Sequence, residues 1–256
     1  MNPKSVKTAI LTYHRIVNGD PLLASEWAFH DVPMQTFKRQ MELISDHQCS
    51  DSGRQTVLIE VTFDDGTEDH LLAAEVLAKL GLSGIFFVIV GRLNTPGYLN
   101  ISNLRTLLAL NQRIGSHTIT HRRLPLLSSQ ELNTELEQSK DMLEQESGRK
   151  IEWLAPPGGV LNDRVFRAAL TAGYRYVRTM DWGYAPSLAT SPMVKPLSSI
   201  PILPTTRESQ FERIIDGRGS FLLFQFKQRL RQAIGQGAYT QLRNNLMKHW
   251  LKLQQR

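Results

Sequence analysis

Two short clusters carry the side chains best suited to chemistry. In the first, Asp64, Asp65 and Gly66 follow an apolar, β-branched run at 56–61. A carboxylate at the end of a buried strand is costly unless it has a partner. Because adjacent strand residues point to opposite faces, we expect a division of labour, in which one Asp holds a cation and the other handles protons. The alternative is an Asp-Gly turn with both acids in solvent.

The second cluster contains His117 and His121, after a short strand-like segment at 113–115. Residues four apart share one face of a helical turn, so we expect both imidazoles to reach the same ion. One Asp of the first cluster would complete a set of two histidines and one carboxylate, with positions left for water and substrate. Zn²⁺ is the default ion for this set, and Co²⁺, Ni²⁺ and Mn²⁺ are compatible. The alternative is a surface histidine pair.

The two clusters, at 62–66 and 117–121, resemble the first two motifs of the polysaccharide deacetylases, also called the chitooligosaccharide deacetylase family. The resemblance runs from about residue 8 to about residue 204. It implies an α/β fold, a distorted and incomplete (β/α) barrel of about seven parallel strands. It also implies a metal-dependent hydrolase that removes N-acetyl groups from an amino-sugar glycan or glycoconjugate and releases acetate. The residue roles implied are a general base at Asp64 and metal ligands at Asp65, His117 and His121.

Further segments resemble the family's other motifs and imply substrate contacts. Tyr13 and His14 are similar to the end of its first strand, and 155–159 to its third motif, where the backbone N–H after the proline pair binds the oxyanion. That residue is Gly158 here, next to Pro157. Asp181-Trp182 is similar to the fourth motif. Trp182 can offer a ring face to a sugar, or it can be a core or rim aromatic.

Two departures from the family pattern concern proton handling. Ala155 stands where the family usually has an Arg that steadies the catalytic Asp, so we expect the protonation of Asp64 to be less controlled. The family's last motif usually supplies a His as general acid, but the only histidine after His121 is His249, in a different context. His14 is the candidate acid; the alternatives are that His14 has a structural role and that water serves as the acid.

These gaps leave two other functions open. One is a catalytically weak or inactive subunit that binds metal and glycan in polysaccharide assembly, and the other is a different metal-dependent hydrolase.

Strand and helix signals alternate along the chain, as in a parallel sheet or barrel. Strands are expected at 8–13, 57–63, 85–90, 113–116, 151–155 and 174–179, and Ser128 with Glu131 has the capping-box spacing of a helix start. The proline-rich stretch 185–204 is expected to be an irregular connection. In either architecture the carboxyl ends of the strands lie at one rim, which would gather the motifs.

Charge and composition divide the chain into a catalytic barrel at 1–210 and a basic helical extension at 211–256. The net charge is +6, and no Asp or Glu follows Asp216. The extension is expected to pack on the barrel or to contact an anionic membrane or polymer.

No nucleic-acid motif is present. The single Cys49 excludes an internal disulfide and a thiolate zinc site. Without a signal peptide or an apolar span, we expect a cytoplasmic location.

Overall fold

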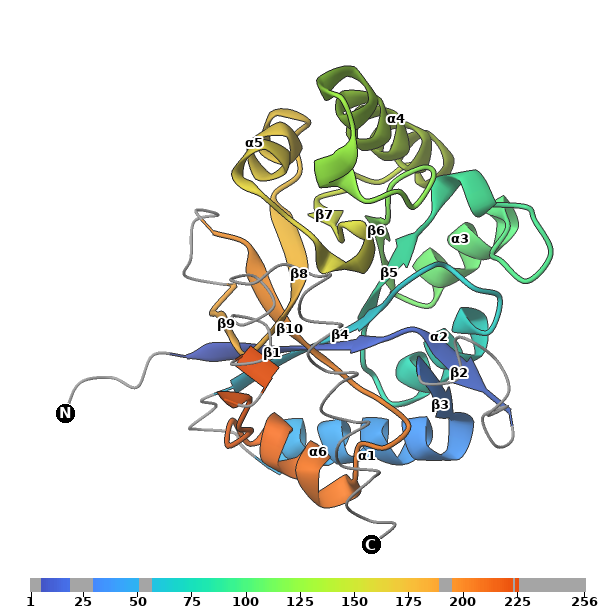
Figure 1. Ribbon diagram of the computed structural model, residues 1–256. Helices are drawn as coiled ribbons and strands as arrows, with labels where there is room; N and C mark the ends of the chain where they lie inside the picture. The colour runs from blue at the N-terminus through green and yellow to red at the C-terminus, as the bar shows by residue number, and fades with distance from the viewer. Residues whose placement is uncertain (1–5, 19–29, 51–56, 189–194, 223, 226–256) are drawn as a thin grey trace, which may run out of the picture. The chain divides into compact units, whose positions relative to one another are not determined.

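The computed structural model describes residues 6–18, 30–50, 57–188, 195–222 and 224–225 (Figure 1). It divides into two units, Met1–Gly219 and Ser220–Arg256, and the first is described below. Residues 226–256 lie outside the described part, so the basic helical extension and its contacts stay predictions. No helix among the described residues is long and apolar enough to cross a bilayer.

Seven parallel strands close into a barrel, so the predicted fold class is confirmed (Figure 1). The ring closes where β1 pairs with β10, through Leu11 with Ile200 and Thr12 with Pro201. A short strand, β9 (Ala185–Pro186), adds to β1 in antiparallel direction. In order around the ring the strands are β1 (Lys7–Tyr13), β4 (Val57–Phe63), β5 (Gly84–Val88), β6 (Arg113–Ser116), β7 (Trp153–Leu154), β8 (Tyr176–Trp182) and β10 (Leu197–Pro201).

The expectation of an irregular connection at 185–204 is wrong, because this stretch contains β9 and the closing strand β10. Pro196 precedes β10 and Pro201 ends it. Proline lacks a backbone N–H, but at the end of a strand it interrupts little of the ladder. The prolines therefore delimit the strand instead of preventing it.

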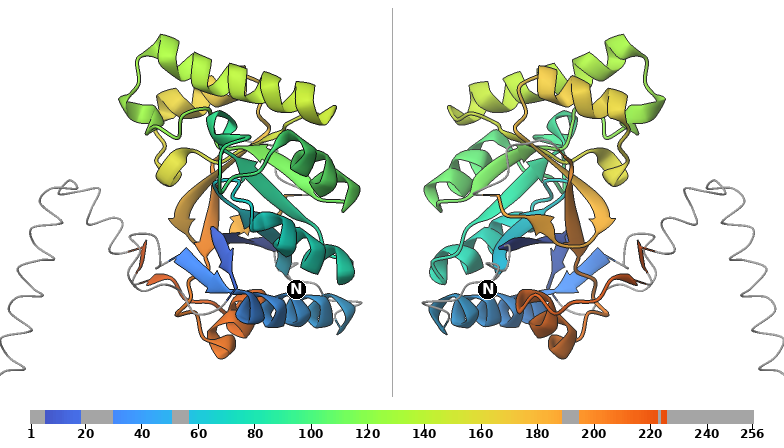
Figure 2. Two further views of the ribbon diagram at one scale, coloured as in Figure 1. Left: turned by 90° about the vertical axis from the view of Figure 1, so that its right-hand side faces the viewer. Right: turned by 90° about the vertical axis from the view of Figure 1, so that its left-hand side faces the viewer.

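Helices cover the outside of the barrel (Figure 2); the first five contact one another in chain order, and the sixth contacts the first. A separate pair of short parallel strands, β2 (Arg15–Val17) and β3 (Asp31–Pro33), lies between β1 and the first helix in the chain. The helices are α1 (Met34–Ser50), α2 (His70–Lys79), α3 (Ile101–Ala109), α4 (Ser129–Ser147), α5 (Asp163–Thr171) and α6 (Glu208–Ile215).

The barrel interior is a packed core, and the side chain of Asp64 points into it. Its buried cluster includes Ile10 of β1 together with apolar residues of β5, β7 and β10. Two residues beyond Ile10, the Thr12 hydroxyl lies 3.2 Å from that of Thr62 on β4. Because side chains alternate along a strand, Thr62 and Asp64 face the same way. Asp64 therefore enters the interior just past the carboxyl end of β4.

The start of α4 offers a test of the local helix signal. The predicted capping box is confirmed, with Ser128 Oγ accepting from Glu131 N at 3.3 Å and Ser128 N donating to Glu131 Oε2 at 2.9 Å. Ser128→Ala should lower the free energy of unfolding by about 1 kcal/mol, because a helical N–H loses its acceptor. Ser129→Ala, one position later and exposed, should change it by less than about 0.5 kcal/mol. Equal losses in urea unfolding would contradict the capping role.

Candidate active site

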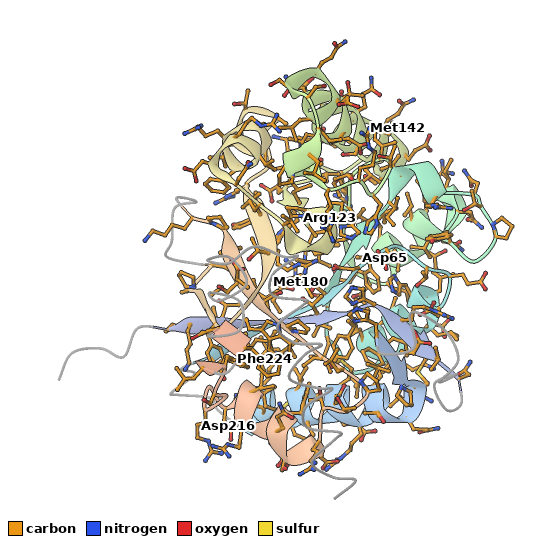
Figure 3. All side chains as sticks on the ribbon, viewed as in Figure 1. Asp65, Arg123, Met142, Met180, Asp216 and Phe224 are labelled. Carbon is orange, nitrogen blue, oxygen red and sulfur yellow. The ribbon has the colours of Figure 1, made fainter. Side chains whose placement is uncertain are left out.

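The structure brings the three expected metal ligands together at the carboxyl ends of β4 and β6. Asp65 Oδ1 lies 3.5 Å from Nε2 of His117 and 3.5 Å from Nε2 of His121. The candidate ligand atoms of all three residues lie within 4.8 Å of one another. Figure 3 shows Asp65 near the centre of the ring of strands, whereas Met142 lies on the outer helix α4.

The orientation of His117 fits metal binding. Its Nδ1–H donates to the carbonyl of Ala155 at 2.6 Å, which leaves the Nε2 lone pair directed toward Asp65. A backbone carbonyl behind a ligating imidazole fixes its tautomer and ring position in this way. His117 is buried, whereas the side chain of His121 is 38% exposed, so the cluster is reachable from solvent. The donor set of two imidazole nitrogens and one carboxylate suits a divalent transition metal.

The two histidines converge through a tight loop, so the expectation of a helical turn is wrong. Thr118 and His121 have left-handed backbones, with φ of 67° and 60°, which a right-handed helix excludes. Glu135 of α4, itself buried, holds the loop by accepting from the backbone N–H groups of Ile119 at 2.7 Å and Thr120 at 3.0 Å. It also accepts from the Thr120 hydroxyl. A helix outside the barrel thus sets the shape of the ligand loop.

Asp64, the expected general base, has an ionic partner that the sequence motifs did not indicate. Nη2 of Arg178, on β8, donates to Oδ1 of Asp64, and the two side chains are 1% and 4% exposed. Since β4 and β8 are not neighbours in the sheet, the pair crosses the barrel interior. The expectation that the protonation of Asp64 is less controlled because Ala155 replaces an arginine is therefore wrong. The available signal was an arginine inside a strand, because a buried arginine requires a partner.

This pair sets the charge of Asp64. Burial alone would raise the pKa of its carboxyl group, but Arg178, with smaller contributions from His117 and His14, holds the pKa below its ordinary value. The same balance applies to Asp65: burial would raise the pKa of its carboxyl group, but His117, 3.5 Å away, holds the pKa below its ordinary value. Both carboxylates are therefore ionised at neutral pH.

His14 lies beside the free oxygen of Asp64, with Nε2 3.9 Å from Oδ2. Burial lowers the pKa of His14 despite the nearby acids, so its imidazole is neutral at pH 7. His30 stacks on it with ring centroids 4.1 Å apart. The backbone carbonyl of His14 accepts from Nε2 of the buried His70 at 2.5 Å. Its main chain is thus anchored while its ring faces the catalytic carboxylate.

The four residues expected to contact the substrate differ in their exposure and in their place in the fold. Tyr13 is fully buried, and its hydroxyl donates to Gln40 Oε1 at 2.8 Å. It therefore offers no surface to a substrate, and the structure does not support the expected contact. Pro157 is buried at the start of a short 3-10 helix, Pro157–Gly159, and Gly158 beside it is exposed with φ of 64°. Trp182 ends β8 and is half-buried.

A pocket of about 580 Å³ opens on the cluster. This volume lies within the range of small-molecule sites. Among its lining residues are His14, Asp65, His121, Arg92 and Tyr98. A sugar unit in this pocket would have access to both the metal ligands and His14.

Comparison with known proteins shows what this arrangement is similar to. Residues 52–177 match the model of the polysaccharide deacetylase family. The protein YxkH of Bacillus subtilis, named as a candidate polysaccharide deacetylase, is 28% identical over 190 residues, which cover 71% of this chain and 67% of the relative. The peptidoglycan-N-acetylglucosamine deacetylase of Bacillus cereus is 30% identical over 122 residues, or 47% of this chain and 55% of that protein.

Solved structures agree with this match. The polysaccharide deacetylase BC0361 of Bacillus cereus superposes with a TM-score of 0.71 at 25% identity, over 82% of this chain and 69% of that one. The deacetylase PplD of Streptococcus pyogenes, solved with acetate, gives a TM-score of 0.73 at 23% identity, over 84% and 100% of the two chains. The second likeness supports the fold.

The hydrogen bonds that Glu135 accepts from the loop between the two histidines predict an effect on metal affinity. Glu135→Ala should weaken Zn²⁺ binding by about 10- to 100-fold, because the loop between the two histidines loses its acceptor. Glu137→Ala, on the exposed face of the same helix, is the matched control and should bind as the wild type does. Titration against a chromophoric chelator measures both. Identical affinities would show that the loop keeps its shape without Glu135.

The Asp64–Arg178 pair predicts a change in the pH profile. In Arg178→Gln the burial of Asp64 is no longer opposed by a guanidinium, so the pKa of the carboxyl group rises. Since a base must be ionised, the acid limb of kcat/KM should move to higher pH, with a loss at neutral pH of about 10- to 100-fold. Arg175→Gln, with its side chain 64% exposed, should leave the profile unchanged. An unshifted acid limb in a folded Arg178→Gln protein would refute this role.

Proposed function

We propose that this chain, whose residues 52–177 match the polysaccharide deacetylase family model, is a metal-dependent hydrolase that removes N-acetyl groups from an amino-sugar glycan or glycoconjugate and releases acetate. One observation carries the proposal: an ionised, buried Asp64 lies beside a ligand set of Asp65, His117 and His121. The set supplies a place for a Lewis acid, and Asp64 supplies a base next to it.

The three ligands would hold a divalent cation, with Zn²⁺ as the first candidate and Co²⁺, Ni²⁺ or Mn²⁺ compatible with the same donors. When bound, such a cation polarises the amide carbonyl and lowers the pKa of an attacking water. Asp64 accepts the proton of that water. Oδ1 of Asp64 is occupied by Arg178, so Oδ2 is the oxygen that receives it.

His14 is placed to handle the second proton transfer. Its Nε2 is 3.9 Å from Asp64 Oδ2, and its neutral ring can take up a proton and donate it to the leaving amine as the C–N bond breaks. The oxyanion would accept from the backbone N–H of Gly158. Pro157 supports that turn, and the ring of Trp182 would flank the sugar.

The alternative is a catalytically weak or inactive subunit that binds metal and glycan. The Asp64–Arg178 pair favours the enzyme. Burying two charges costs free energy, and neither residue is needed to hold a cation. A chain that only binds would gain stability by replacing both with apolar residues.

Acetate release tests the choice directly. With Zn²⁺ added, the wild type should release acetate from N-acetylated oligosaccharides, and Asp64→Asn should be slower by about 10²- to 10⁴-fold because the base is lost. Asp141→Asn, an exposed change on α4, is the control, and a chelator should abolish activity until metal is restored. Undetectable release by both wild type and Asp64→Asn, across a broad substrate panel, would support the binding subunit.

A further inference from the structure

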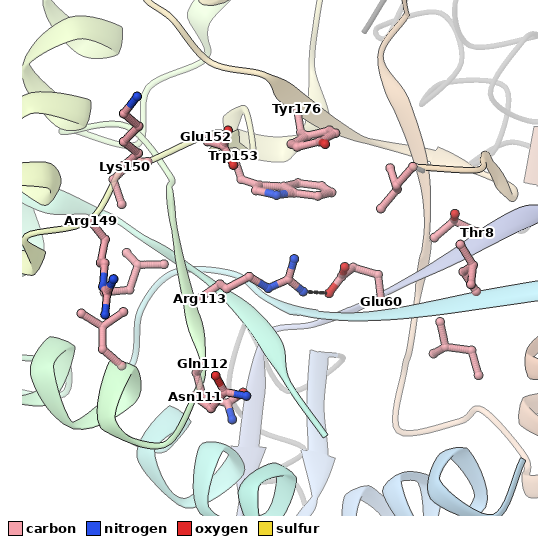
Figure 4. A pocket seen from close by; sticks show the side chains of 16 residues that line it. Thr8, Glu60, Asn111, Gln112, Arg113, Arg149, Lys150, Glu152, Trp153 and Tyr176 are labelled. Atoms are coloured by element: carbon pink, nitrogen blue, oxygen red, sulfur yellow. Dashed lines mark hydrogen bonds and ion pairs between the residues drawn. The ribbon is translucent and has the colours of Figure 1, made fainter. Parts of the chain in front are cut away.

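Figure 4 shows a second pocket, of about 790 Å³, which is separate from the candidate active site. Its walls come from the amino-terminal parts of the strands, including Thr8 of β1, Glu60 of β4, Arg113 of β6, Trp153 of β7 and Tyr176 of β8. In a parallel barrel these strand starts lie at the rim away from the chemistry. This second pocket shares no lining residue with the pocket that contains His14 and Asp65.

One wall of this pocket is a charge pair. Arg113 Nη2 donates to Glu60 Oε1, and the two side chains are 45% and 12% exposed. A guanidinium has five N–H donors and a carboxylate accepts at two oxygens, so one mutual contact leaves donors and acceptors for a ligand. Glu60 belongs to the barrel wall and Arg113 reaches across to it (Figure 4).

The facing wall is aromatic. The rings of Trp153 and Tyr176 stack with centroids 4.5 Å apart and an angle of 23°. Figure 4 shows both across the cavity from Arg113 and Glu60. Trp153 is 5% exposed and packs in the barrel core, so it holds the partly buried ring of Tyr176 in position before any ligand arrives. A rigid aromatic ring opposite a hydrogen-bonding pair defines a slot with one apolar side and one polar side.

We propose that this pocket binds a pyranose unit of a neutral or N-acetylated sugar. A pyranose has a C–H face that packs on an aromatic ring, and adjacent hydroxyls that both donate and accept, as the Arg113–Glu60 pair requires. An anionic ligand would meet the carboxylate of Glu60. The polar rim carries both signs, through Arg149, Lys150 and Glu152. The choice of sugar rests on the proposed function, and the site would hold part of a glycan away from the catalytic end.

Calorimetric titration of metal-free protein with the tetramer of N-acetylglucosamine tests this site without turnover. Tyr176→Ala should raise Kd by about tenfold or more, because an aromatic contact is lost. The double variant Glu60→Leu with Arg113→Leu should do the same. It removes both charges together, so no unpaired charge stays buried. Arg105→Ala, an exposed change on α3 outside the pocket lining, should bind as the wild type does.

The outcome is independent of the deacetylase assay. The expected result is weaker tetramer binding in Tyr176→Ala and in the double variant, while both keep wild-type unfolding temperatures and their acetate release at saturating substrate. Equal Kd values in all four proteins would overturn the proposal, as would no heat of binding in the wild type. Loss of acetate release in Asp64→Asn with tetramer binding intact would separate the two sites.

Discussion

A negative charge inside a closed barrel requires a positive charge opposite it, and the active site depends on this constraint. Asp64 and Arg178 satisfy it across the interior, and the Arg178 guanidinium also lies over the ring of Phe87, 5.1 Å from its centroid. The contact holds the pKa of the Asp64 carboxyl group below its ordinary value and occupies one of its oxygens, so in the proposed mechanism the other oxygen accepts the proton. Removal of either partner alone would leave the other buried and unpaired, which is strongly destabilising.

Around this pair, the candidate metal ligands depend on unusual backbone conformations. Asp65, Thr118 and His121 are all left-handed without being glycine, and each such residue costs about 1–2 kcal/mol. In the loop at 117–121, hydrogen bonds to the acceptor oxygens of Glu135, on a helix outside the barrel, oppose that cost. The precision of the site thus comes from the surrounding scaffold, and the ligand loop would not keep this shape in isolation.

Much of this arrangement could be predicted from residue types and spacing. The sequence shows a recognisable set of metal donors in Asp65, His117 and His121. The alternation of strand and helix signals along the chain locates most strands of the ring. Arg178 could not be predicted from the family pattern, which places the steadying arginine at the position of Ala155, whereas only three-dimensional proximity to Asp64 matters. β10 was missed because its prolines dominate the local signal, while its pairing with β1 is remote in sequence. The opposite directions of Tyr13 and His14 follow from strand alternation and could have been anticipated.

The distances in sequence between paired elements also bear on how the chain folds. Asp64 and Arg178 are 114 residues apart, and the last strand of the ring joins the first. Closing such long loops costs entropy before any contact is gained, so topologies of this kind fold slowly. During synthesis Asp64 emerges well before Arg178, so its carboxylate stays hydrated until the arginine is available. The catalytic end would therefore be among the last parts of the molecule to become native.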